Sequence, residues 1–121
     1  MLKIRAAQMK ALAEVAERAF VERASDYLRG AFPEKCAELG PEAVNCSVRS
    51  GLEKARGYGL RLDVEVLRYL NLVYTFGSDF DRLPWAAEIL DDTEISAAGK
   101  IEELMEAAFE AEAALAEQTH G

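Results

Sequence analysis

Apolar residues recur at steps of three and four along most of the chain, and this spacing predicts amphipathic α-helices. Pro and Gly residues bound these periodic segments, as expected where helices begin and end. The predicted helices cover residues 6–30, 33–39, 41–56, 62–76, 84–90 and 97–118. Ala and Glu are abundant while Thr and Ile are scarce, which favours helix over strand. We therefore predict an all-α fold, a compact bundle of five or six helices that forms a single domain over residues 1–121.

The predicted helix over residues 62–76 is the most hydrophobic. It has almost no polar face apart from Arg68 and Asn71, and such a helix normally lies at the centre of a bundle. A β-strand over LNLVYTF is the competing interpretation. Gly51 lies inside the helix predicted before it, where Gly costs up to about 1 kcal/mol relative to Ala. A close neighbour would offset this cost, so we expect two helices to cross at Gly51.

Half of the ten aromatic residues lie in one stretch, Tyr69 to Trp85, around a Gly-Ser-Asp turn. Such rings either pack as the centre of a core or offer contact area to a partner. The sequence leaves both outcomes open. In the turn, we expect Asp79 and Asp81 to cap the following helix, whose amino terminus attracts negative charge.

The last predicted helix carries a heptad-like apolar series that weakens into alanines. Its members are Ile101, Leu104, Met105, Ala108, Phe109, Glu112 and Leu115. Ser96 is expected to cap this helix at its amino end. The series also leaves open a homodimer that forms through the last helix.

Charge is distributed unevenly. Residues 1–61 carry 11 Lys and Arg against 8 Asp and Glu, a net charge of +3, whereas residues 62–121 carry 3 against 14, a net charge of −11. An acidic half of this density argues against nucleic acid and anionic lipid as ligands. It favours a basic protein partner through electrostatic steering. The simpler interpretation is that these carboxylates only keep the exposed faces of two helices well solvated.

Candidate catalytic groups are few. Cys36 and Cys46 have no CxxC spacing and no nearby His, so they do not form a zinc site. We expect buried, reduced thiols, because a disulfide between them would require an oxidising compartment. His120 lies one residue from the carboxyl terminus, where a general base is not held in place.

The acidic turns do not suggest a metal or a reaction. Asp79 and Asp81 lack the further oxygen ligands of a calcium loop. Asp91, Asp92 and Glu94 lie in a polar turn, where burial would not separate their pKa values for acid–base catalysis. We therefore expect no enzyme, no cofactor and no metal. The alternative to a binding protein is a small cysteine-dependent enzyme that uses Cys36.

The sequence does not suggest a membrane-spanning or secreted protein. No apolar run approaches the roughly 18 residues that a membrane-spanning helix needs. The first 20 residues are interrupted by charges and show no cleavage site, so they do not form a secretory signal. The expected location is the cytoplasm.

Four segments carry a resemblance: FPEKCAELG, GLEKARGYGL, DVEVLRYLNLVYTFGSDFD and LPWAAEIL. Over about residues 30–105 the chain resembles small, uncharacterised helical proteins of Gram-negative bacteria that tend to be encoded beside type VI secretion effectors and spike components. The shared positions are mostly structural: Pro33, Gly40, Gly59, Tyr69, Gly77, Asp79, Asp81, Pro84 and Trp85. The family pattern has a longer spacer before the Pro-Trp pair than this chain has.

The resemblance implies an accessory role around a secreted toxin and no catalytic residues. We expect a protein-binding module, a chaperone or adaptor for a secreted effector. An immunity protein that neutralises a basic toxin is the alternative. The predicted contact residues are Tyr74, Asp79, Phe80, Asp81 and Trp85 around the turn, and Glu102, Glu106 and Glu110 on the last helix.

Overall fold

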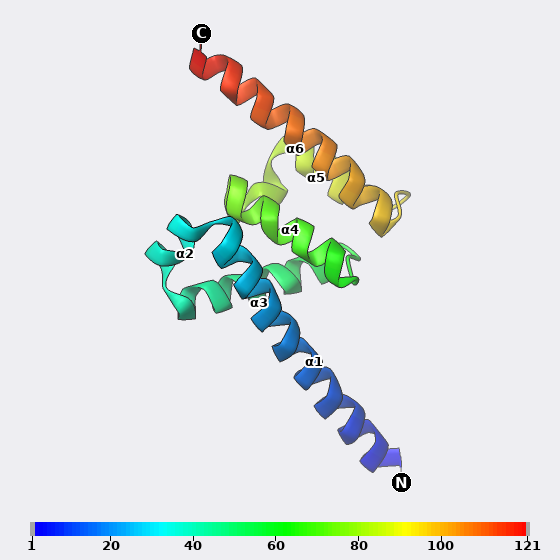
Figure 1. Ribbon diagram of the computed structural model, residues 1–121. Coiled ribbons are helices and arrows are strands. Elements are labelled where there is room, and N and C mark those ends of the chain that lie inside the picture. The colour runs from blue at the N-terminus through cyan, green and yellow to red at the C-terminus, as the bar shows by residue number, and fades with distance from the viewer. Residues whose placement is uncertain (1, 121) are drawn as a thin grey trace. The chain divides into compact units, whose positions relative to one another are not determined.

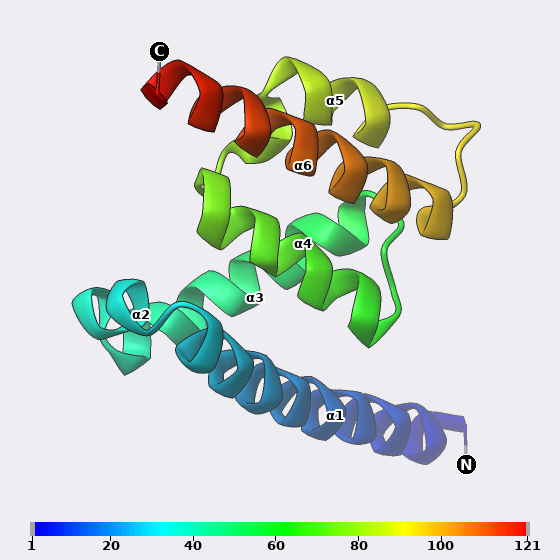
Figure 2. The same ribbon diagram turned by 45° about the horizontal axis from the view of Figure 1, so that its top comes forward.

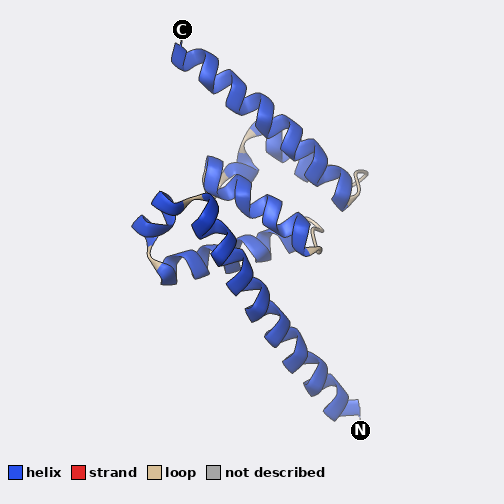
Figure 3. Cartoon of the chain, viewed as in Figure 1, coloured by secondary structure: helices blue, strands red, loops and turns tan. Residues whose placement is uncertain are grey.

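The computed structural model describes the backbone of residues 2–120 and the side chains of residues 7–115. In chain order, the elements are α1 (Leu2–Ala31), α2 (Pro33–Leu39), α3 (Pro41–Gly57), α4 (Asp63–Phe76), the 3-10 helix η1 (Phe80–Arg82), α5 (Pro84–Leu90) and α6 (Ala97–His120) (Figure 1). No strand occurs over residues 2–120 (Figure 3). The predicted all-α fold is confirmed. The strand alternative for LNLVYTF is wrong, because this segment lies within α4.

The short helices begin and end where the sequence indicates. Pro33 and Pro84 are the first residues of α2 and α5, where the missing amide hydrogen of Pro has no cost. Gly40 follows α2 with a φ of 85°, and Gly77 follows α4 with a φ of 107°. Such angles strain any residue with a Cβ, which is why both helices end at Gly. The two terminal helices are longer than predicted at their outer ends.

The contacts within the chain divide it into two compact units, Met1–Arg49 and Ser50–Gly121. Whether the two units make up the single domain expected over residues 1–121 stays a prediction. In the first unit, α2 packs against α1, and Ala24, Leu28 and Val44 are fully buried. The buried Ser25 hydroxyl donates a hydrogen bond to Oδ1 of Asn45 at 2.8 Å, which links α1 to α3 within this unit.

In the second unit, α4 contacts both η1 and α6, and α5 contacts η1 and α6 (Figure 2). The carboxylate of Glu65 fixes the start of α4, because it accepts hydrogen bonds from the backbone amides of Arg61 and Leu62 at 3.2 and 3.1 Å. Tyr69 and Leu70 of α4 are fully buried. This helix therefore occupies the centre of its unit, as its hydrophobic sequence predicts.

The helix crossing expected at Gly51 is confirmed. A Cβ added at Gly51 would collide with Cδ2 of Leu70, a side chain that is itself fully buried on α4. Gly51 therefore leaves room on α3 for the Leu70 side chain of α4, which a larger residue would displace. The close packing offsets the cost of Gly inside a helix.

Replacing Gly51 by Ala should destabilise the protein. The gain in helix propensity, about 1 kcal/mol, is outweighed by overpacking, which costs about 1–3 kcal/mol in a full core. Gly57 on the same helix is the matched control, because an added Cβ meets nothing within 4 Å there. Urea denaturation followed by circular dichroism would measure both variants. Equal stabilities for Gly51→Ala and Gly57→Ala would show that the crossing tolerates a methyl group.

Candidate protein-binding surface

The aromatic stretch forms a continuous series of ring contacts inside the second unit. Tyr69 lies 4.9 Å from Phe80 between ring centroids, Phe80 lies 6.3 Å from Trp85, and Trp85 meets Phe76 edge-on at 5.2 Å. Tyr69 is fully buried and Phe80 is 1% exposed. Burial also raises the pKa of the Tyr69 hydroxyl, which has no hydrogen-bond partner among the described residues. The rings therefore pack α4, η1 and α5 together.

Asp81 connects the turn to α3. Its Oδ2 accepts a hydrogen bond from the Tyr58 hydroxyl at 2.8 Å, and its Oδ1 lies 3.5 Å from Nζ of Lys54. The Lys54 ammonium also donates to the carbonyl of Ser78 at 3.1 Å. The prediction that Asp79 and Asp81 cap α5 is wrong, because Leu83 is the N-cap residue and no side chain caps this helix. A buried carboxylate needs several donors, and Lys54 of α3 and Tyr58, the residue after α3, supply them.

Tyr58 makes this connection dependent on pH. Burial, the hydrogen bond to Asp81 and the negative charge of Asp81 raise the pKa of Tyr58 from 10.0 to about 12. A raised tyrosine pKa means that folding favours the neutral hydroxyl. The stabilisation is therefore complete below pH 10 and is lost as the pH rises towards 12.

Tyr58→Phe should therefore lower the free energy of unfolding at neutral pH by about 1.5–3 kcal/mol, the usual contribution of a hydrogen bond to a charged group. The difference between variant and wild type should shrink as the pH rises from 10.0 to about 12. Denaturant titrations at a series of alkaline pH values would measure it. A constant difference across this range would contradict the assignment of the Tyr58 pKa.

Burial removes three predicted contact residues from the candidate surface. The side chains of Tyr74, Phe80 and Asp81 are 5%, 1% and 8% exposed, so they lie in the interior of the unit. Phe80 and Asp81 are buried because the turn packs against α4 and against Lys54 and Tyr58, contacts that sequence spacing does not reveal. Trp85 is partly buried, and Asp79 is exposed with its carboxylate 3.7 Å from Lys54. Contacts of these two residues with a partner stay predictions.

One face of α6 packs against α4 and α5. Ile101, Leu104 and Ala108, three members of the predicted apolar series, are buried on this face. Ser96 caps the helix as expected, since its hydroxyl accepts a hydrogen bond from the amide of Gly99 at 3.1 Å. The sequence did not indicate a role for Lys100, whose buried ammonium donates to the carbonyl of Leu90, at the end of α5, at 2.8 Å. A cation at the carboxyl end of a helix is favourable, so Lys100 joins α6 to α5.

Met105, Phe109 and Leu115, which also belong to the apolar series of the last helix, are not buried with these residues. They are 36%, 75% and 56% exposed. The residues Met105 and Phe109, four positions apart, form one row on the helix surface, called the apolar strip below. Leu115 follows Ala108 by seven positions and so shares the angular position of the buried residues, yet it is exposed. The carboxyl end of α6 extends past α5 (Figure 2).

A second row lies beside the apolar strip. Glu102, Glu106 and Glu110 are all exposed and follow each other at steps of four, so they form one row called the acidic ladder below. Met105, Glu106, Phe109 and Glu110 together line a shallow, open hollow on α6. The exposure of the three glutamates agrees with their predicted placement on the surface. The structure places Glu106 and Glu110 beside two exposed members of the apolar series, Met105 and Phe109.

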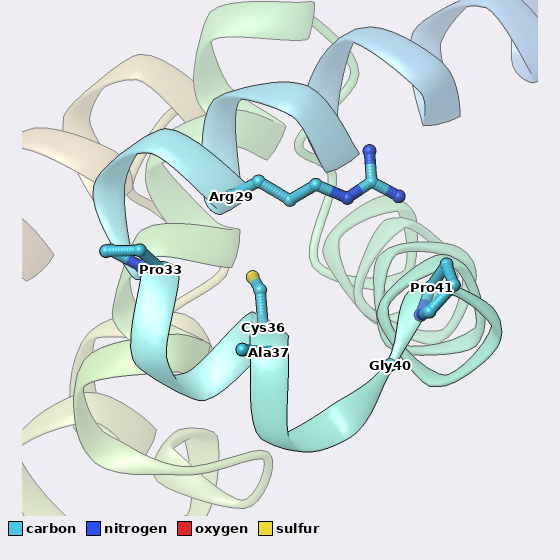
Figure 4. Close-up of a pocket in the computed structure, with 6 residues that line it drawn as sticks. All are labelled: Arg29, Pro33, Cys36, Ala37, Gly40 and Pro41. Atoms are coloured by element: carbon cyan, nitrogen blue, oxygen red, sulfur yellow. The ribbon is translucent and has the colours of Figure 1, made fainter.

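A separate pocket in the first unit contains Cys36 (Figure 4). Its lining residues are Arg29, Pro33, Cys36, Ala37, Gly40 and Pro41. The Cys36 sulfur points towards the side on which Arg29 lies (Figure 4). No His or carboxylate is among the lining residues, so none of them can take a proton from the thiol. Both cysteines are free, and Cys46 is exposed, which corrects the expectation that both are buried.

The remaining candidate groups do not assemble. No three His, Cys, Asp or Glu residues whose side chains are described lie close enough to share a metal ion. Asp92 instead closes its own turn, accepting a hydrogen bond from the amide of Glu94 at 2.9 Å. The side chain of His120 lies outside the described residues. No helix in the part of the chain that the structure describes combines the length and apolarity that crossing a bilayer requires.

Comparison with protein-family models, with curated proteins and with solved structures finds no match to this chain. The resemblance to proteins encoded beside type VI secretion effectors is therefore a prediction that these comparisons do not test.

Proposed function

We propose that the chain is a binding module that holds another polypeptide against the apolar strip and acidic ladder of α6. The observation that carries this proposal is the exposure of Phe109, at 75%, directly beside Met105 and a row of three carboxylates. A single exposed apolar residue is common on any protein. Two on adjacent helical turns, bordered by charge, have the composition of a small interface with an apolar centre and a polar rim.

The two rows have different roles in this proposal. Large rings such as Phe109 supply most of the binding free energy once a partner removes them from water. Exposed carboxylates contribute little to affinity, but they raise the association rate of a basic partner and disfavour acidic ones. The strongly acidic second half of the chain, with a net charge of −11 over residues 62–121, adds to the same long-range field.

We further propose that the bound polypeptide is a secreted effector and that the chain is its accessory chaperone or adaptor, without a catalytic step. This part rests on the resemblance of residues 30–105 to the helical family described above. The absence of a proton acceptor from the Cys36 pocket lining supports a role without catalysis. The net charge of −11 also favours the second candidate, an immunity protein that covers a basic toxin surface.

Co-expression separates these two functions. The chain would be produced together with each product of the genes that flank its own gene, and complexes would be isolated by affinity and size-exclusion chromatography. A chaperone raises the level or export of the effector and leaves its toxicity intact, whereas an immunity protein restores growth. If no flanking product forms a complex with the chain, the proposed role around an effector is wrong.

A further inference from the structure

We infer that the segment bound by α6 is a basic amphipathic helix of the partner; this inference rests on the proposed function. The apolar strip and the acidic ladder run parallel along α6, each with a spacing of four residues. Side chains four apart form the ridges that pack into the grooves of a second helix. The hollow lined by Met105, Glu106, Phe109 and Glu110 lies along such a groove.

An extended partner fits this surface less well. A peptide that binds as a strand needs the free edge of a sheet to supply backbone hydrogen bonds, and residues 2–120 contain no strand. The backbone groups of α6 are already paired inside the helix, so a partner must be recognised through side chains. A helical partner satisfies its own backbone groups and presents one face, which matches this requirement.

Charge determines which helix fits. Residues 97–115 of α6 carry five glutamates and one basic residue, Lys100, which is buried. A second copy of α6 would place carboxylates opposite carboxylates, which disfavours a homodimer through this face. The complementary partner has large apolar residues at three- and four-residue steps, with Lys or Arg four positions apart along one flank. Such a helix covers the apolar strip and neutralises the acidic ladder at the same time.

Designed peptides test the inference directly. The first is a helical peptide of about 15 residues with a leucine face flanked by lysines at steps of four; this length is near the minimum for an isolated helix. The second has glutamates in place of the lysines. The third keeps the lysines but has two central prolines, which prevent a helix. Binding to the full chain would be measured by fluorescence anisotropy at low and high salt, with light scattering to determine the mass of the complex.

The lysine peptide should bind at least about tenfold more tightly than either other peptide. The glutamate peptide loses the charge pairing and the proline peptide loses the helix, and a loss of about 1.4 kcal/mol weakens binding tenfold. Phe109→Ala should weaken its binding about 30-fold. Glu106→Gln should reduce the salt dependence, whereas Glu53→Gln, an exposed glutamate on α3, should not. A complex mass of one chain and one peptide is expected.

Three results would overturn the inference: no binding of the lysine peptide, equal binding of the proline peptide, or binding that Phe109→Ala leaves unchanged. The proposed function fails separately. If a natural partner binds the chain and Phe109→Ala abolishes that complex while the lysine peptide does not bind, the surface is correct and the helical class of partner is wrong. If Phe109→Ala affects neither complex, both proposals are wrong.

Discussion

Replacing Phe80 by Ala will lower the free energy of unfolding by about 3–5 kcal/mol, the cost of removing a large ring from a packed core. Phe80 is 1% exposed and touches the rings of Tyr69 and Trp85. Since η1 contacts both α4 and α5, the cavity would lie where three elements meet. Domains of this size have a free energy of unfolding of only about 5–15 kcal/mol, so the substitution would remove a large part of it.

The same substitution at Phe109 is the matched control. Phe109 is 75% exposed on α6, and substitutions at such positions usually change stability by about 0.5 kcal/mol or less. Urea denaturation followed by circular dichroism would compare the two variants with the wild type. The fluorescence of Trp85, the only tryptophan, gives an independent measurement of unfolding, because its ring lies beside that of Phe80. Similar losses for Phe80→Ala and Phe109→Ala would mean that the burial of the aromatic series is misassigned.

The second large effect is on binding. Phe109→Ala should weaken the complex with the natural partner by about 2 kcal/mol, or about 30-fold in Kd, because an aromatic anchor carries a large share of the energy in a small interface. The change should appear mainly in the dissociation rate. Replacing Glu102, Glu106 and Glu110 together by Gln should instead slow association and reduce its dependence on salt. Surface plasmon resonance measures both rates.

Met9→Ala is the control for this prediction. Met9 is 70% exposed, but it lies on α1 and has no part in the proposed surface. Its loss should leave both rate constants unchanged. A Met9→Ala variant that weakens the complex as much as Phe109→Ala does would place the binding surface on α1 instead.

The local structure could be predicted from the sequence because its signals are local. Pro33 and Pro84 each start a helix, Gly40 and Gly77 each end one, and Ser96 caps α6 as its residue type suggests. The crossing at Gly51 was also predictable, since Gly inside a helix has a cost that close packing explains. These features depend on backbone chemistry over a few residues, which the sequence displays directly.

The candidate surface was less predictable, because periodicity shows which residues share a helix face and does not show where the neighbouring elements stop. Met105 and Phe109 continue the apolar series of α6, yet they lie outside the face covered by α4 and α5. In the turn, Asp81 has the residue type of a helix cap but contacts Lys54 on α3 and Tyr58 just after it. Both outcomes depend on contacts between residues far apart in the chain, which spacing alone does not reveal.

Oxidation of Met105 by hydroxyl radicals, measured by mass spectrometry with and without the bound partner, tests the central claim most directly. Met105 lies in the apolar strip, and Met9 on α1 is an internal reference in the same molecule. If the partner covers α6, the oxidation of Met105 and the labelling of Phe109 will fall while that of Met9 stays constant. Unchanged labelling of Met105 and Phe109 in a fully formed complex would contradict the assignment of this face as the binding surface.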